Sequence, residues 1–311
     1  MVKKIQKLKI CVLVLSVFSL GQLFAQQDAQ YTQYMYNPLN INPAYAGQRN
    51  GLSIVNLNRL QWAGIEGAPN TFTIAAHSPL RNERLGLGVN VVRDDLGPAS
   101  ETQFEGNASY TLPLSDQGLK LSFGLKAGLH MLQTDWSEGR AFQGNDVAFA
   151  NNLRLNAPIV GAGLYLSSYN WYFGLSVPNL LETNRVERDN NTIGVGTERM
   201  HFFAIAGYVF KLSESVQFKP AILLKAVPGA PPISDFSANF LYREKLTLGV
   251  AYRLEDAISI LTAIRVSKIM EIGYAFDLTT SEIVDYTSGT HELMLRFEIP
   301  NYTGFISPRF F

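Results

Sequence analysis

The chain has 311 residues, of which 47% are hydrophobic and 17% are charged, and its formal net charge is zero. This low charge content excludes a disordered chain and a basic nucleic-acid-binding protein, because both classes depend on abundant charged residues. A mean hydropathy of +0.03 excludes a polytopic helical membrane protein, in which each span needs about 20 apolar residues.

The first 25 residues have the pattern of a secretory signal peptide. Four lysines lie in the first nine positions, residues 11–24 are almost wholly apolar, and Ala25 precedes Gln26. This order of basic, apolar and small residues is typical of a cleaved export signal. A single anchoring helix is the alternative, but the apolar run is shorter than the about 20 residues that a span needs. We predict cleavage after Ala25, which removes Cys11, the only cysteine of the chain.

Residues 26–50 form a second region, which is rich in Gln, Tyr, Asn and Pro and does not alternate like a strand. Each proline fixes its own φ and biases the preceding Asn towards an extended backbone. We predict a periplasmic N-terminal segment that plugs the mouth of the following domain or docks onto a partner; a disordered leader is the alternative. The candidate partner-binding residues are Tyr34, Asn37, Pro38, Asn42, Pro43, Tyr45 and Gly47.

From residue 51 onwards, apolar residues alternate with other residues again and again. Residues 121–130, for example, read LSFGLKAGLH, with an apolar residue at every odd position up to 129. A period of two predicts a β-strand with one apolar face. About fourteen such segments follow, each near the length that a tilted membrane-spanning strand requires. They are expected at 52–62, 70–79, 84–93, 101–113, 118–133, 158–167, 170–178, 201–211, 215–227, 233–243, 245–253, 257–266, 268–277 and 290–300.

The connections between these segments alternate between short turns and longer loops. Turns such as 168–169 contrast with loops such as 135–157 and 179–200. This arrangement is typical of an outer-membrane barrel. We therefore predict an all-β fold: a transmembrane antiparallel up-and-down β-barrel of about 14 strands over residues 51–311, with short periplasmic turns and long extracellular loops. A soluble exported β-sandwich is the alternative, but its strands average about 5–6 residues.

The face opposite the lipid carries charges of both signs and many glycines. Mixed signs predict paired or hydrated lumen residues and not a single-sign ion filter. Inward glycines remove bulk, so that a plug segment or a passing chain can approach the wall closely. The inward charged residues are Lys126, Lys219, Lys225, Arg265, Glu271, Asp277, Arg296 and Glu298; the inward glycines are Gly86, Gly88, Gly124, Gly128, Gly161, Gly163, Gly174, Gly249 and Gly273.

The sequence contains no motif for catalysis, cofactor binding or metal binding. It has no G-x-S-x-G, P-loop or H-E-x-x-H pattern, and its Gly-x-Gly pairs lie within predicted strands. The four histidines fall on separate segments without the spacing of zinc ligands. We expect a non-enzymatic protein without catalytic, cofactor or metal site. A barrel enzyme with residues gathered from several strands is a third possibility.

Two runs near the N-terminus, QYMYNP at 33–38 and INPAYAG at 41–47, closely resemble the opening of the PorP/SprF family. The resemblance extends over essentially the whole mature chain, and the N-terminal run is its most specific part. It implies an outer-membrane protein of Bacteroidetes, associated with the type IX secretion system and gliding motility. Its further features are Trp62, Ser78-Pro79, Gly86-Leu87-Gly88, His291-Glu292-Leu293 and Arg296-Phe297.

The resemblance implies an interaction role. Some relatives are required for the export or surface attachment of a large adhesin, and others contact periplasmic lipoproteins of the secretion machinery. We therefore expect a subunit of the type IX secretion system that is embedded in the lipid bilayer of the outer membrane. It would dock a secreted surface adhesin, periplasmic machinery or both, and it would bind no nucleic acid. An outer-membrane pore or transporter for small or hydrophobic solutes is the alternative.

Overall fold

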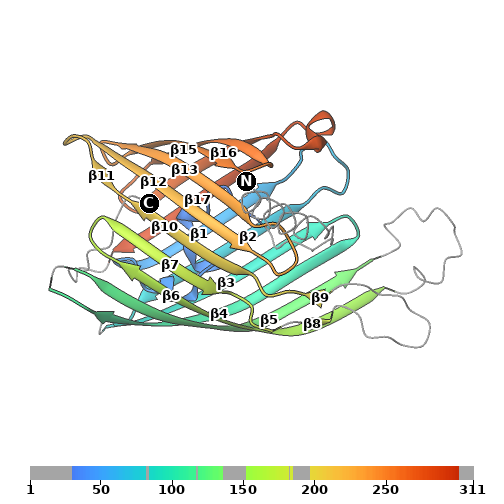
Figure 1. Cartoon of the computed structure of the whole chain (residues 1–311), viewed down its shortest axis with the longest axis horizontal. Coiled ribbons are helices and arrows are strands. Elements are labelled where there is room, and N and C mark those ends of the chain that lie inside the picture. The colour runs from blue at the N-terminus through green and yellow to red at the C-terminus, as the bar shows by residue number, and fades with distance from the viewer. Residues whose placement is uncertain are drawn as a thin grey trace, which may run out of the picture.

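The computed structural model describes residues 30–81, 84–116, 118–135, 152–181, 183–184 and 197–300. The predicted signal peptide, residues 1–25, lies outside these ranges, as does most of the predicted loop 135–157. Figure 1 shows long strands, tilted and side by side, that wrap into a barrel. No helix among the described residues is long and apolar enough to cross a membrane.

Strands account for nearly all of the regular structure. They are β1 Gly51–Leu60, β2 Asn70–Pro79, β3 Leu85–Leu96, β4 Ala99–Pro113, β5 Lys120–Thr134, β6 Leu153–Ser167, β7 Trp171–Val177, β8 Thr183–Asn184, β9 Thr197–Glu198, β10 Phe202–Tyr208, β11 Phe210–Lys211, β12 Val216–Ala226, β13 Ile233–Tyr242, β14 Leu246–Arg253, β15 Ala257–Arg265, β16 Met270–Thr279 and β17 Thr290–Pro300. A short 3-10 helix, η6 (Glu282–Tyr286), precedes β17.

The main sheet closes on itself. Successive strands pair antiparallel, β1 pairs with β17, and β10 pairs with both β7 and β12. Only Val209 separates β10 from β11, and both pair with β12, so the two form one strand of the barrel. The barrel therefore has 14 antiparallel strands in sequence order, as predicted. Closure removes the exposed sheet edges that an open sheet or sandwich retains.

Side chains alternate between the two faces of this closed sheet. In β14, Leu248, Val250 and Tyr252 are exposed on the outside, whereas Thr247 and Arg253 are buried on the inside. The outward apolar residues face lipid. Lipid cannot hydrogen-bond to the backbone, but a closed sheet pairs its backbone N–H and C=O groups internally, so its apolar face can contact lipid without leaving polar groups unpaired. The strands thus enclose a lumen lined mostly by polar and small side chains, with a group of buried apolar residues that includes Val55 and Leu57.

All fourteen predicted spans are present, with two corrections at their ends. β6 begins at Leu153, five residues before the predicted start. The predicted loop 94–100 is wrong: β3 and β4 continue pairing to Leu96 and Ala99, and only a tight turn at Gly97 and Pro98 joins them. Gly97 has φ +54°, a conformation that glycine adopts without steric cost. The β3–β4 hairpin extends beyond the apolar part of the strands because backbone hydrogen bonds do not depend on the hydropathy of the side chains.

Candidate functional site

Residues 31–49 fill the interior of the barrel, and we call them the plug. Each of these residues is buried except Asn40, which is half-buried. Asn42 caps the last of the three short 3-10 helices that shape the plug, because its Oδ1 accepts a hydrogen bond from the backbone N–H of Ala44 at 2.9 Å. Prolines begin the second and third of these helices, where their fixed φ suits a first helical turn. The helices are η1 (Tyr34–Tyr36), η2 (Pro38–Asn40) and η3 (Pro43–Tyr45).

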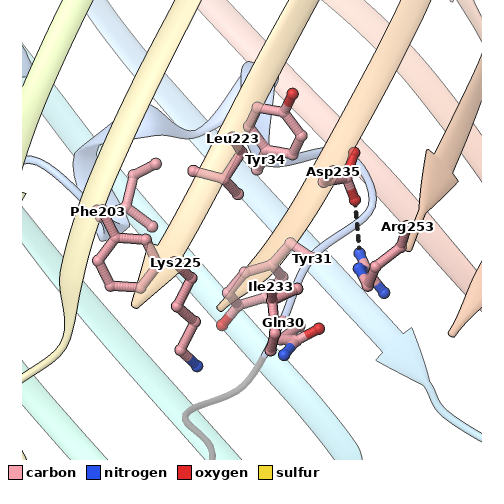
Figure 2. Close-up of a pocket in the computed structure, with 10 residues that line it drawn as sticks. Gln30, Tyr31, Tyr34, Phe203, Leu223, Lys225, Ile233, Asp235 and Arg253 are labelled. Carbon is pink, nitrogen blue, oxygen red and sulfur yellow. Dashed lines mark ion pairs between the residues drawn. The ribbon is translucent and has the colours of Figure 1, made fainter. Parts of the chain in front are cut away.

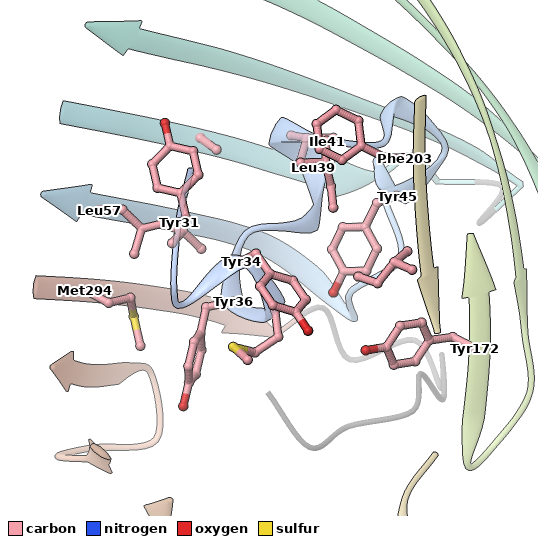
Figure 3. Packing of buried hydrophobic residues seen from close by; sticks show 14 of the residues in the cluster. Tyr31, Tyr34, Tyr36, Leu39, Ile41, Tyr45, Leu57, Tyr172, Phe203 and Met294 are labelled. Carbon is pink, nitrogen blue, oxygen red and sulfur yellow. The ribbon is translucent and has the colours of Figure 1, made fainter. Parts of the chain in front are cut away.

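An apolar cluster holds the middle of the plug against the first strand. Tyr34 and Leu39 are at most 2% exposed. They belong to one cluster with Val55 and Leu57, the inward side chains of β1. Figure 3 shows Leu57 and Met294 on the wall beside the plug. Because this apolar surface is removed from lumen water, its burial stabilises the plug inside the barrel.

Glycines on the inner wall allow the plug backbone to lie against the strands. A Cβ atom added to Gly124 would overlap the backbone of Ala44, and one added to Gly163 would overlap the side chain of Asn42. The predicted close approach to inward glycines is thus confirmed where the plug meets the wall. These positions are Gly86, Gly88, Gly124, Gly163, Gly174 and Gly273, whereas Gly128, Gly161 and Gly249 face residues of the barrel itself.

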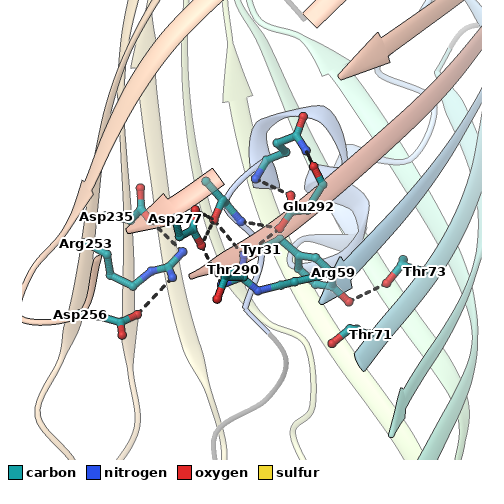
Figure 4. A network of polar contacts seen from close by, with 12 residues as sticks. Tyr31, Arg59, Thr71, Thr73, Asp235, Arg253, Asp256, Asp277, Thr290 and Glu292 are labelled. Carbon is teal, nitrogen blue, oxygen red and sulfur yellow. Dashed lines mark hydrogen bonds and ion pairs between the residues drawn. The ribbon is translucent and has the colours of Figure 1, made fainter. Parts of the chain in front are cut away.

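A buried polar network, which we call the latch, holds the N-terminal end of the plug. The two carboxylate oxygens of Glu292 accept hydrogen bonds from the backbone N–H groups of Thr32 at 2.9 Å and Gln33 at 2.8 Å. The Thr32 hydroxyl donates to Asp277 at 2.7 Å and accepts from Arg59 at 2.9 Å. Arg59 also forms ion pairs with Asp277 at 2.9 Å and with Glu292 at 3.1 Å (Figure 4). Arg59 therefore contacts both buried carboxylates, and plug donors hydrogen-bond to each of them.

The other end of the plug is held near the rim where β1 begins. The backbone N–H of Gly47 donates to Nδ1 of His77 at 3.1 Å. The side-chain amide of Gln48 donates to two wall hydroxyls, and Arg49 lies 3.4 Å from Glu298. The plug therefore runs from the short-turn rim, where it leads into β1, to the latch at the long-loop ends of β16 and β17.

Two further pairs of opposite charge lie on the inner wall, in agreement with the predicted mixture of signs. Nζ of Lys126 lies 2.6 Å from Glu105 and donates to the carbonyl oxygen of Asn40 in the plug at 3.1 Å. Arg296 pairs with Glu271 on the neighbouring strand. This pairing lets the wall tolerate buried charge and gives the lumen no single-sign stripe along these strands.

The seven predicted partner-binding residues all lie in the plug. The ring of Tyr45 packs edge-on against His77 and Tyr165, and the amide of Asn42 donates to the carbonyl oxygen of Leu164 at 2.9 Å. Since these residues contact the barrel wall, a partner reaches them only if the plug moves. Partner binding therefore stays a prediction for Tyr34, Asn37, Pro38, Asn42, Pro43, Tyr45 and Gly47.

The latch contains residues that the sequence does not single out. Thr32 and Arg59 carry no motif, and Glu292 is noticed only through the family resemblance. A usable signal exists in β1, where Arg59 follows Val55 and Leu57 at inward positions. A single charged residue at the end of an apolar inward face predicts a buried partner of opposite sign, because an unpaired buried charge is costly.

A pocket lies beside the N-terminal half of the plug, against β10, β12, β13 and β14 (Figure 2). Phe203, Leu223 and Lys225 line one side of it. On the other side, Oδ2 of Asp235 pairs with Arg253 at 3.1 Å, whereas Oδ1 of Asp235 has no hydrogen-bond partner among the described residues. The pocket thus combines apolar walls with charged groups near the long-loop rim. Over the described part of the chain, no three His, Cys, Asp or Glu residues are grouped to hold a metal ion.

A family model described as "Type IX secretion system membrane protein PorP/SprF" matches residues 23–297. The chain belongs to the PorP/SprF family. The protein is therefore a membrane barrel of the type IX secretion system, and it lies in the outer membrane. Neither this family nor its fold is an enzyme class. A search of curated proteins gave no match.

Solved structures similar to this PorP/SprF protein are outer-membrane barrels. Omp33 of Acinetobacter baumannii is 10% identical, with a TM-score of 0.48 over 81% of this chain and 100% of that one. The toluene transporter TbuX of Ralstonia pickettii is 12% identical, with a TM-score of 0.46 over 83% of this chain and 92% of that one. The CymD monoaromatic hydrocarbon channel is 11% identical, with a TM-score of 0.47 over 87% of this chain and 94% of that one. At these identities the likeness concerns the barrel fold alone.

Proposed function

We propose that this PorP/SprF protein is a non-enzymatic docking subunit of the type IX secretion system. It holds a secreted surface protein, an adhesin, at the long-loop rim, or periplasmic machinery such as lipoproteins at the short-turn rim, or both. Export and surface attachment of the secreted protein would follow from these contacts.

The observation that carries this proposal is the filled lumen. Plug residues 31–49 are buried, apart from the half-buried Asn40, and are held at one end by the latch and at the other by Gly47 and Arg49. A solute pore needs a continuous water-filled path, which the plug obstructs. The two rims therefore offer the surfaces on which a partner can act without displacing the plug.

The test is gentle affinity purification of the tagged protein from native outer membranes, followed by mass spectrometry. We expect a large surface protein or periplasmic lipoproteins of the secretion system to be recovered in stoichiometric amount. A tagged outer-membrane barrel from outside the secretion system, purified in the same way, controls for non-specific capture.

Recovery of the barrel alone would contradict docking. The pure protein would then be examined for single-channel conductance. Sustained conductance by the wild type would favour the alternative function, a pore or transporter for small or hydrophobic solutes.

A further inference from the structure

One strand interrupts the apolar outer surface of the barrel. Asn56 and Asn58 lie at outward positions of β1, which alternate with the buried inward residues Val55, Leu57 and Arg59. Most outward positions at the middle of the other strands are Leu, Ile, Val, Phe, Tyr or Ala. Two carboxamides, two residues apart on one strand, therefore face the membrane where hydrocarbon is expected.

The register places this amide pair among apolar neighbours. Asn56 lies opposite Ile74 of β2 and Leu295 of β17. Asn58 lies opposite Phe72 of β2 and Leu293 of β17. The direct cross-strand neighbours of the pair are thus apolar on both sides, and the outward Leu60 lies between Asn58 and the end of β1, where Asn70 and His291 are its neighbours.

Hydrogen bonds within the barrel satisfy only part of the pair. The amide of Asn58 donates to Oδ1 of Asn56 at 2.9 Å, and the amide of Asn56 donates to the carbonyl oxygen of Thr73 at 2.9 Å. A carboxamide has two donors and a two-fold acceptor. Within the described part of the chain, Oδ1 of Asn58 and one N–H of each amide are left over, and lipid offers them no partner.

We propose that the outer face of β1 is the contact between two copies of this chain in the outer membrane. The leftover groups of the pair are an acceptor and two donors, so the pair is complementary to itself. A twofold axis along the membrane normal brings Asn58 of one copy to the amides of the other, in the isologous arrangement that homodimers commonly use. Ile74 and Leu295 pack around the hydrogen bonds, which form where no water competes.

Cysteine cross-linking tests this contact directly, because the only natural cysteine is Cys11, within the predicted signal peptide. Asn58→Cys is introduced into the full chain, and native outer membranes are oxidised with copper phenanthroline. The matched control is Leu175→Cys, an outward residue of β7 on the opposite side of the barrel and 44% exposed. We expect a covalent product of twice the monomer mass from Asn58→Cys, at least tenfold more abundant than from Leu175→Cys.

Equal dimer yields from the two variants, or no dimer from Asn58→Cys, would overturn the proposal. A product joined to a different protein would overturn it too and would assign the face to another membrane barrel. The double variant Asn56→Leu with Asn58→Leu gives a second readout, the mass of the protein in nanodiscs formed from native membrane. We expect the variant to be monomeric and folded where the wild type is dimeric; an unchanged dimer would contradict the role of the amides. These outcomes do not depend on whether the protein docks a secreted partner.

Discussion

Glycines decide how closely the plug approaches the barrel wall. Gly124 of β5 has the backbone of Ala44 at the place of its missing Cβ atom, whereas Gly106 of β4 points outwards and has only the carbonyl oxygen of Ala127 near that place, at 3.7 Å. Glycine is thus required by the plug at Gly124 but not at Gly106. Substituting each glycine by a larger residue tests this difference.

We expect Gly124→Val to displace η3 from the wall and to destabilise the barrel by about 2 kcal/mol, the usual effect of overpacking a filled interior. Gly106→Val is the matched control and should leave the stability unchanged. Urea unfolding in lipid nanodiscs, followed by tryptophan fluorescence, measures both. Equal stability of the two variants would show that the plug does not press on Gly124.

Among the residues that the structure describes, Arg59 is the cation that forms ion pairs with both carboxylates of the latch. Removing it leaves Asp277 and Glu292 together inside the barrel without this counter-charge. Breaking one side of a buried ion pair is costly because the remaining charge stays desolvated.

We expect Arg59→Gln to lower the free energy of unfolding by about 3 kcal/mol, as measured by chemical denaturation. The control is Arg93→Gln, since Arg93 pairs with Asp95 at 3.1 Å but both side chains are more than 40% exposed. A surface pair of this kind contributes at most about 1 kcal/mol. If the two variants lose equal stability, the latch is not a buried charge network.

The plug and the inner wall of the barrel stabilise one another. Short 3-10 helices have few internal hydrogen bonds, so the plug draws its order from the wall: apolar contacts to β1, glycines along β3 and β5, and the latch at the far end. The wall also depends on the plug, because β1 presents Val55 and Leu57 inwards where an empty lumen would favour polar residues.

Deleting residues 31–46 should open the lumen. We expect the wild type to be nearly silent in planar bilayers and the deletion variant to conduct ions steadily, because the remaining wall is lined mostly by polar side chains. Heat-modifiable migration on electrophoresis checks that the shortened chain still forms a barrel. A folded, silent deletion variant would mean that something other than the plug closes the lumen.

At the scale of the whole molecule, the two rims differ. The short turns, such as 168–170, lie at the rim where β1 begins and β17 ends, and the connections 61–69, 178–201 and 280–289 lie at the other. The β8–β9 hairpin belongs to the 178–201 connection. If the proposed docking of a large exported partner is correct, we expect it at the long-loop rim, where the connections are longer.

Deleting residues 179–200 should abolish surface retention of the secreted partner and leave barrel assembly intact, since β7 ends at Val177 and β10 begins at Phe202. The control deletion removes 228–231 from the shorter loop at the same rim. Partner on the cell surface is measured by antibody labelling of intact cells. Retention that survives the first deletion would exclude this loop as the dock.

The strands were predictable because alternation is a local property. A residue such as Val250 is apolar because it faces lipid. The residues two positions before and after it face the same side and are apolar for the same reason. The order of short and long connections then leaves one closed topology. Predictability fails for strand ends outside the membrane, as at Gly97, where backbone pairing continues without an apolar face.

What the sequence by itself determined is the barrel: its fourteen strands, its lipid-facing side, and the family to which it belongs. Only the tertiary structure decided that residues 31–49 occupy the lumen and that Thr32 meets Arg59, Asp277 and Glu292 there. Those partners are separated from Thr32 by 27, 245 and 260 positions along the chain. Contacts of this range depend on closure of the sheet, which brings β1 and β17 together, and no periodicity along the chain records them.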